Sequence, residues 1–318
     1  MTMLGWLLLA MGGVAAIVWG AETFAKNLAV ASTRLGVSMF ALAVLLAGAE
    51  PEELATSVTA SLRHAPGIAI GDVIGANVAI CFVALGVGAV LAPLPFDRRV
   101  RRYALAGLPA GVLAAFLAWD GLVTRVEGLI LVAAYAVFIG VIWGVERRPP
   151  ALGETAELAE AAAEEGSGEG RVGRELVLVF AGVGAMAIGA SALVEGIRRI
   201  SGVESTQTRL GLVVVGFATA FELVVLAWSS ARRGMTTVVV ASVIGSFTYN
   251  ATMTLGAGAL ARPLQLIDAT QLRMPWLVMI TSIAIVIGLA WRKGHLGRVA
   301  GTVLLALYPL AILVFLLS

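Results

Sequence analysis

The stretch that this chain repeats is GDVIGANVAICFVALGVGAVLAPL, residues 71–94, which aligns without gaps on ASVIGSFTYNATMTLGAGALARPL, residues 241–264. Three glycines and a proline recur in this alignment at an offset of 170, together with five apolar positions. Further upstream, Glu53-Leu54 matches Glu222-Leu223 and Gly20-Ala21 matches Gly189-Ala190, both at an offset of 169. Apolar residues agree easily by chance in such a chain, but glycine and proline in register do not. The sequence therefore predicts an internal repeat.

The composition excludes a soluble globule. Of the 318 residues, 59% are hydrophobic and 13% are charged, and the mean hydropathy is +0.96. A soluble domain has about a quarter of its residues charged. The net charge of +2 is too small to indicate nucleic acid as a partner. One cysteine and two histidines argue against a disulfide framework, a cysteine-rich metal site and chemistry that needs a central histidine.

The apolar runs predict an all-α integral membrane protein. A membrane-spanning helix needs about 20 mostly apolar residues. The runs that meet this length lie near 4–25, 37–62, 68–94, 102–119, 122–145, 175–197, 209–231, 235–261, 274–292 and 297–317. Five spans lie in each half, so the second copy must enter the membrane from the opposite side. We expect ten transmembrane helices in two inverted five-helix repeats, residues 1–145 and 175–318, an arrangement typical of secondary transporters.

An acidic, Gly- and Ser-containing segment separates the halves, and we interpret residues 146–174 as a solvated linker. Cytoplasmic loops of membrane proteins carry an excess of Lys and Arg. With the N-terminus outside, the cytoplasmic loops would hold 15 of these residues and the outer loops 7. This count predicts that both termini lie outside, that the linker is cytoplasmic and that the protein resides in the plasma (inner) membrane.

Several carboxylates lie within the predicted spans. Glu50, Glu52 and Glu53 occur together in LLAGAEPEELATS, and Glu222 is the only charge in VVVGFATAFELVVLAW. A charge at the centre of a membrane helix costs about 2.5–3.5 kcal/mol on insertion scales, so it is expected to face a cavity or a partner. No Lys or Arg lies at matching depth. This leaves a bound cation, bound protons, or a protonated Glu that is hydrogen-bonded to backbone.

Local backbone and neutral side chains favour the cation. Pro51 removes a backbone N–H and frees a carbonyl one turn earlier, and a free carbonyl at membrane depth can ligate a cation. Ser246 and Asn250 lie four residues apart on one helical face and can supply neutral oxygens. Ca²⁺ takes six to eight oxygen ligands, whereas zinc and copper favour nitrogen and sulfur. The residues therefore indicate a hard cation.

These motifs resemble those of the calcium/cation antiporter superfamily, which includes the sodium/calcium exchangers. Members carry Gly-Thr-Ser-Leu-Pro-Glu-Leu in one span of each repeat and Gly-Ser-Asn-Ile-Phe-Asn in the next. Here the first copy reads Gly48-Ala49-Glu50-Pro51-Glu52-Glu53-Leu54 and Gly75-Ala76-Asn77-Val78-Ala79-Ile80. The second copy reads Phe217-Ala218-Thr219-Ala220-Phe221-Glu222-Leu223 and Gly245-Ser246-Phe247-Thr248-Tyr249-Asn250. The resemblance covers nearly the whole chain.

The resemblance implies that Glu53 and Glu222 are the two metal-binding carboxylates. It also implies that the cation-binding shell is completed by Glu50, which stands where the family has Ser, and by Thr219, Ser246 and Asn250. An alternative register that counts from Gly48 would place Glu52 at the position of Glu53. Alanine or isoleucine replaces four of the family's polar side chains, at Ala49, Ala76, Ile80 and Ala218.

The expected function is a secondary active antiporter and not an enzyme. It would exchange a cation, Ca²⁺ before others, for Na⁺ or H⁺ by alternating access at a midplane carboxylate site. We expect no cofactor beyond the transported cations, membrane lipid and metal cation as partners, no nucleic acid, and a monomer. Two alternatives remain: a carrier of a monovalent cation or another solute on the same scaffold, and a membrane-embedded Mg-dependent lipid enzyme. The enzyme is disfavoured because the carboxylates lie mid-span and the Arg clusters lie at helix ends.

Overall fold

A computed structural model describes residues 2–34, 49–146, 172–234 and 236–318, and these residues are almost entirely helical. The first half contains α1 (Met3–Arg34), α3 (Pro51–Leu62), α4 (Pro66–Ala79), η1 (Ile80–Ala84), α5 (Leu85–Leu91), α6 (Arg98–Leu117) and α7 (Arg125–Glu146). The second contains α9 (Val172–Ser201), α10 (Glu204–Leu210), η2 (Gly211–Val215), α11 (Gly216–Arg232), α12 (Thr236–Tyr249), η3 (Asn250–Thr254), α13 (Leu255–Ala261), α14 (Thr270–Trp291) and α15 (Arg298–Leu317).

Eight helical stretches among the described residues are long and apolar enough to cross a membrane. They correspond to eight of the ten predicted spans. The predicted span 37–62 has its first part, residues 37–48, outside the described residues, and the remainder consists of Ala49, Glu50 and α3. The predicted span 235–261 appears as α12, η3 and α13 in direct succession, apart from residue 235, which is not described. Most of the predicted linker, residues 147–171, also lies outside the described residues.

The outer surface of the bundle is apolar. Large apolar side chains such as Phe116, Phe180 and Ile188 are each more than 70% exposed. A water-soluble monomer does not expose apolar faces of this extent. The prediction of a multi-pass integral membrane protein is therefore confirmed.

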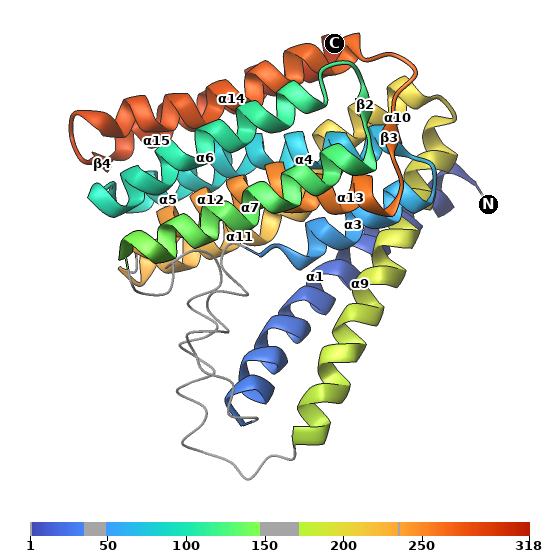
Figure 1. The fold of residues 1–318 in the computed structure, drawn as a ribbon, viewed down its shortest axis with the longest axis horizontal. Coiled ribbons are helices and arrows are strands. Elements are labelled where there is room, and N and C mark those ends of the chain that lie inside the picture. The colour runs from blue at the N-terminus through green and yellow to red at the C-terminus, as the bar shows by residue number, and fades with distance from the viewer. Residues whose placement is uncertain (1, 35–48, 147–171, 235) are drawn as a thin grey trace.

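The helices α1 and α9 form an antiparallel pair, and α9 also packs against α3. Figure 1 shows α1 and α9 side by side, at a steep angle to the layered bundle that the rest of the described chain forms. Their backbones touch at glycines, and the contacts are reciprocal. A Cβ on Gly13 would lie 2.6 Å from the carbonyl oxygen of Gly189, and one on Gly20 would lie 2.7 Å from that of Gly182. Small residues allow this close approach where lipid supplies no hydrophobic driving force.

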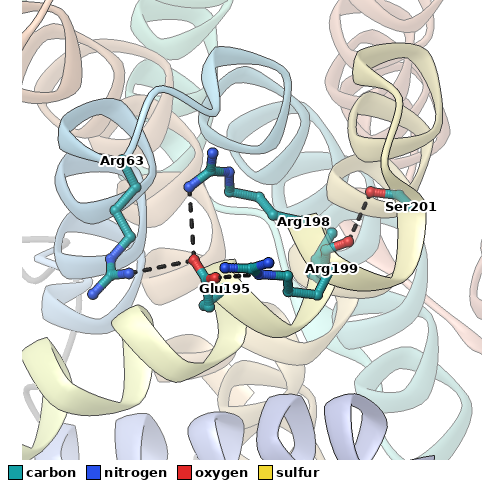
Figure 2. Close-up of polar contacts among 6 residues, drawn as sticks. Arg63, Glu195, Arg198, Arg199 and Ser201 are labelled. Atoms are coloured by element: carbon teal, nitrogen blue, oxygen red, sulfur yellow. Dashed lines mark hydrogen bonds and ion pairs between the residues drawn. The ribbon is translucent and has the colours of Figure 1, made fainter. Parts of the chain in front are cut away.

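A cluster of ion pairs joins the C-terminal part of α9 to the end of α3 (Figure 2). Glu195 accepts contacts from Arg63 at 3.4 Å, from Arg198 at 3.6 Å and from Arg199 at 2.7 Å. Only the contact with Arg63 crosses between these two helices, because Arg198 and Arg199 belong to α9 itself. The arginine side chains are 38–61% exposed, so each pair contributes about 0–1 kcal/mol.

Three of the long helices are interrupted by a π-helical turn: η1 follows α4, η2 precedes α11 and η3 follows α12. A π-helical turn inside an α-helix is rare and is frequent at functional sites. The first and third turns, Ile80–Ala84 and Asn250–Thr254, are separated by the same 170 residues as the sequence repeat. The α4–η1–α5 helix lies in the centre of the bundle, since 83% of its most apolar window is buried.

Two short antiparallel strand pairs connect the halves. β1 (Leu94–Pro95) pairs with β4 (His295–Leu296), and β2 (Leu122–Val123) pairs with β3 (Leu264–Gln265). β1 follows α5 and β3 follows α13, so each strand at the end of a repeated segment meets a strand of the other half. This reciprocity parallels the glycine contacts of α1 and α9.

Replacing Gly13 by alanine should separate α1 from α9, because the added methyl group would collide with the Gly189 carbonyl. We expect a loss of about 1–3 kcal/mol of stability, the usual cost of overpacking. Gly12→Ala is the matched control, since nothing lies within 4 Å of a Cβ there and alanine favours the helix. Thermal unfolding in detergent measures both variants; equal melting temperatures would contradict the close contact.

Candidate cation-binding site

The acidic motif of the first half forms the beginning of α3. Glu50 precedes the helix with non-helical dihedral angles (φ −120°, ψ 85°), and Pro51 occupies the first turn, where its missing N–H costs nothing. Glu52 and Glu53 follow within the same turn. The three glutamates are 5%, 2% and 1% exposed, so all are buried. The positive end of the helix dipole stabilises negative charge at this place.

Glu50 meets the second half of the chain directly. The hydroxyl of Ser246 in α12 donates a hydrogen bond to Oε1 of Glu50. Ser246 is fully buried. The structure therefore brings together two of the residues that the sequence analysis selected, from segments 196 residues apart.

Glu53 lies in a polar environment built from both halves. Asn250, the first residue of η3, is a neighbouring side-chain donor, and Asp72, Glu52 and Glu222 act electrostatically on the Glu53 carboxylate. Within the described chain, no hydrogen bond of normal geometry reaches either oxygen of Glu53. Glu222 on α11 is half-buried. Glu53 and Glu222 thus lie within electrostatic reach of each other.

A chain of amides and hydroxyls continues from Asn250. Its side-chain nitrogen donates to Oδ1 of Asn77 at 3.3 Å, and its own oxygen accepts from Thr254 at 3.3 Å. Asn77 in turn donates to the carbonyl oxygen of Phe247 at 3.2 Å. Asn77 is not among the site residues expected from the sequence, because the resemblance places the polar helper positions at Ala76 and Ile80. The contact with Asn250 is visible only once α4 and η3 are packed together.

Thr219 has a partner that the sequence analysis missed. Its hydroxyl donates to Oδ1 of Asp72 at 2.9 Å, with the carbonyl of Val215 as a second acceptor at 3.1 Å. Asp72 is fully buried in α4. The signal was present in the sequence, since Asp72 is an acidic residue within the predicted span 68–94.

Glycines position α4 against α10, η2 and α11. A Cβ on Gly71 would lie 2.8 Å from the backbone nitrogen of Leu212, and one on Gly216 would lie 2.5 Å from that of Ala76. Any larger residue would push the helices apart. This contact brings the Asp72 side chain within hydrogen-bonding distance of Thr219.

The assembled oxygens are of three kinds: carboxylate, hydroxyl and amide. These are the ligands that hard cations such as Na⁺ and Ca²⁺ take. Among the residues described here, no group of three or more His, Cys, Asp and Glu side chains is arranged to hold a metal ion by itself. The chemistry open to the site is reversible binding of a cation by carboxylates from two halves of the chain, supplemented by neutral oxygens.

Comparison with known sequences places this geometry in context. The sequence model of the family described as sodium/calcium exchanger protein matches residues 4–144 and 175–317. The uncharacterised membrane protein MJ0091 of Methanocaldococcus jannaschii is 27% identical over 93% of this chain and 90% of its own length. The sodium/calcium exchanger MaX1 of Methanosarcina acetivorans is 37% identical over 27% of this chain and 25% of its own length.

Comparison with solved structures shows the same fold. The sodium-calcium exchanger NCX_Mj, in crystals soaked with 100 mM Na⁺ and 10 mM Sr²⁺, superposes with a TM-score of 0.62. The two chains are 22% identical, and the match covers 98% of this chain and 99% of the other. At this identity, the likeness shows the fold alone.

The Asn77 bridge gives a stability prediction. Asn77→Leu keeps the approximate size of the side chain but leaves the Asn250 amide and the Phe247 carbonyl without this partner. We expect a loss of about 1–3 kcal/mol, the cost of leaving buried polar groups unsatisfied. Thr302→Val is the control, because its exposed hydroxyl bonds only within its own helix, to Arg298. Thermal unfolding in detergent measures the melting temperature of both variants. If Asn77→Leu lowered the melting temperature no more than Thr302→Val does, this would contradict the bridge.

Proposed function

The chain belongs to the sodium/calcium exchanger protein family, and on this premise we propose that it is an antiporter that exchanges Ca²⁺ for Na⁺ or H⁺. The family consists of membrane transporters of metal cations, so the chain is a transporter and not an enzyme. The alternative of a membrane-embedded lipid enzyme is thereby wrong. The exchanged cations are substrates of the protein and not resident cofactors.

One observation carries the proposal: buried carboxylates of the first half meet polar groups of the second. Glu50 accepts from Ser246, and Glu53 lies beside Asn250 within electrostatic reach of Glu222. Neither half could bind the cation alone. In this proposal Glu53 and Glu222 hold the ion, Glu50, Ser246 and Asn250 complete its shell, and Thr219 supports it from α11.

We assign the chain to ten transmembrane helices in two inverted repeats, residues 1–145 and 175–318. The reciprocal contacts of Gly13 with Gly189 and of Gly20 with Gly182 support this assignment, because an offset of 169 exchanges the two contacts. The two reciprocal strand pairs and the π-helical turns at an offset of 170 support it as well. The site then lies between the repeats, where alternating access can expose it to each side in turn.

The oxygens that remain at the site limit the coupling ion to Na⁺ or H⁺. Alanine and isoleucine occupy four positions where relatives have hydroxyl or amide side chains, so sites for several Na⁺ are depleted. Glu50 supplies an additional carboxylate in place of a hydroxyl. Both Na⁺ and H⁺ fit this chemistry, and a transport assay with each gradient separates them.

We place the protein in the plasma (inner) membrane as a monomer, with both termini outside and the acidic linker, residues 146–174, in the cytoplasm. The excess of Lys and Arg in the alternate loops supports this orientation. In this orientation the end of α3 and the strand pair β2–β3 face the outside.

Glu222→Gln should abolish exchange while the protein still inserts and purifies. The substitution keeps the shape of the side chain and removes one of the two charges that hold the cation. Loss of such a charge contact costs about 3 kcal/mol, which corresponds to at least about 100-fold weaker transport. The measurement is Ca²⁺ uptake into inverted vesicles, driven by a Na⁺ gradient and, separately, by a pH gradient.

The matched control is Glu22→Gln, which removes a carboxylate exposed on α1 and should transport normally. Full uptake by Glu222→Gln would remove the assigned site. A wild-type protein that moves Na⁺ but no Ca²⁺ under either gradient would favour a carrier of monovalent cations on this scaffold.

The ion pair between α3 and α9 should affect the rate of exchange and not the affinity. We propose that α1 and α9 slide against the other helices during exchange. Arg63 ties α9 to α3 through Glu195 (Figure 2). Arg63→Gln should therefore change turnover by up to about fivefold, since an exposed pair is worth about 1 kcal/mol or less. Arg198→Gln, which breaks a contact within α9 alone, is the control. A changed Ca²⁺ affinity in Arg63→Gln with unchanged turnover would contradict this role.

A further inference from the structure

Asp72 is a buried acidic residue that the assigned cation shell does not use. It lies in α4, in the helix that forms the centre of the bundle, and its side chain has no exposed surface. A carboxylate at membrane depth is expensive, and the residues found there usually mark an ion or proton path. An acidic residue at this buried position is therefore expected to have a functional role.

The hydrogen bonds of Asp72 account for one of its oxygens. Oδ1 accepts from the Thr219 hydroxyl at 2.9 Å. Within the described part of the chain, Oδ2 is buried and has no hydrogen-bond partner, and the same holds for both oxygens of Glu53. The carboxylates of Asp72, Glu52 and Glu222 all lie near enough to act electrostatically on Glu53, and α4 packs against α3. Two buried carboxylates with open oxygens thus lie close to each other, on α4 and α3.

A purely structural role would not need the charge. Asparagine could accept the same hydrogen bond from Thr219 without the cost of burying an ionised group. The second copy of the repeat carries Ser242 at the position of Asp72, so a neutral polar side chain suffices there. When both carboxylates are ionised, the open oxygens of Asp72 and Glu53 repel each other, and either a cation or a proton between them removes this repulsion.

We propose that Asp72 is a further cation-binding residue, and that its Oδ2 and the Glu53 carboxylate are the anionic ligands of a position for a hard cation beside Glu222. This inference rests on the proposed exchange function and assigns an additional ligand to it. Thr219 then acts through Asp72: its hydroxyl holds Oδ1 and leaves Oδ2 for the ion. Its role is positioning, which differs from the direct ligand role implied by its place in the motif.

Asp72→Asn is the decisive variant, because it keeps the acceptor for Thr219 and removes only the charge. Titration calorimetry on the full chain in detergent measures the binding of Ca²⁺ alone and of Na⁺ alone. We expect binding of at least one of these ions to weaken about tenfold or more, since ligand charge sets the affinity of such sites. Ser242→Ala, the neutral counterpart in α12, is the control and should bind both ions as the wild type does.

Unchanged affinity of Asp72→Asn for both ions would overturn the assignment. If this variant does not insert, wild-type crystals soaked with Sr²⁺ or Tl⁺ give the answer by anomalous scattering. A peak within about 3 Å of an Asp72 oxygen, the range of ligation by hard cations, supports the proposal. A peak confined to Glu53 and Glu222 overturns it.

The two levels of the proposal fail in different ways. A wild-type protein that binds a cation at Asp72 but drives no exchange in vesicles would refute the antiport function and keep the ligand. Exchange that depends on Glu222 and is untouched in rate and affinity by Asp72→Asn would keep the antiport function and refute the ligand.

Discussion

Burial of carboxylates inside a membrane protein is the constraint on which this structure depends. An ionised group loses its hydration there, and only polar partners or a cation can compensate. The chain meets this demand across its two halves, through the bond from Ser246 to Glu50 and the bond from Thr219 to Asp72. In both of these bonds the acidic side chain comes from the first half and the hydroxyl comes from the second. The halves therefore stabilise each other at the place where the cation is expected to bind.

Glycine makes these contacts possible, because the partners are short side chains on different helices. Gly71 and Gly216 allow α4 to lie against η2 and α11, which brings Asp72 to Thr219. Close backbone approach at glycines also pairs α1 with α9, at Gly13 and Gly189. In lipid, such packing replaces the hydrophobic effect as the force between helices. The core around the site is thus tightly packed. The pair formed by α1 and α9 packs against α3 and is also joined to it by an exposed ion pair (Figure 1).

The departures from the family motif become coherent when the contacts are considered together. Glu50 places a carboxylate where the motif has a hydroxyl, and Ser246 of the other half donates its hydroxyl to that carboxylate. Ile80, the repeat counterpart of Asn250, has no polar group. Asn77 instead supplies the polar side chain from the first half, and it accepts a hydrogen bond from Asn250. Asp72 adds a charge close to Glu53. The site is therefore richer in carboxylates and poorer in hydroxyls than the motif, which changes how charge is balanced as ions exchange.

The sequence alone determined the membrane-spanning class, most helix positions and the candidate glutamates, because hydropathy, span length and isolated charges are read along the chain. It also predicted the juxtaposition of Glu50 with Ser246 in outline, through repeat and motif. The tertiary structure decided which oxygens meet: Asp72 with Thr219, across 147 residues, and Asn77 with Asn250, across 173. No periodicity encodes these pairs. They arise from the crossing of helices at glycines, and the depth and rotation of each helix fix which side chains come within hydrogen-bonding distance.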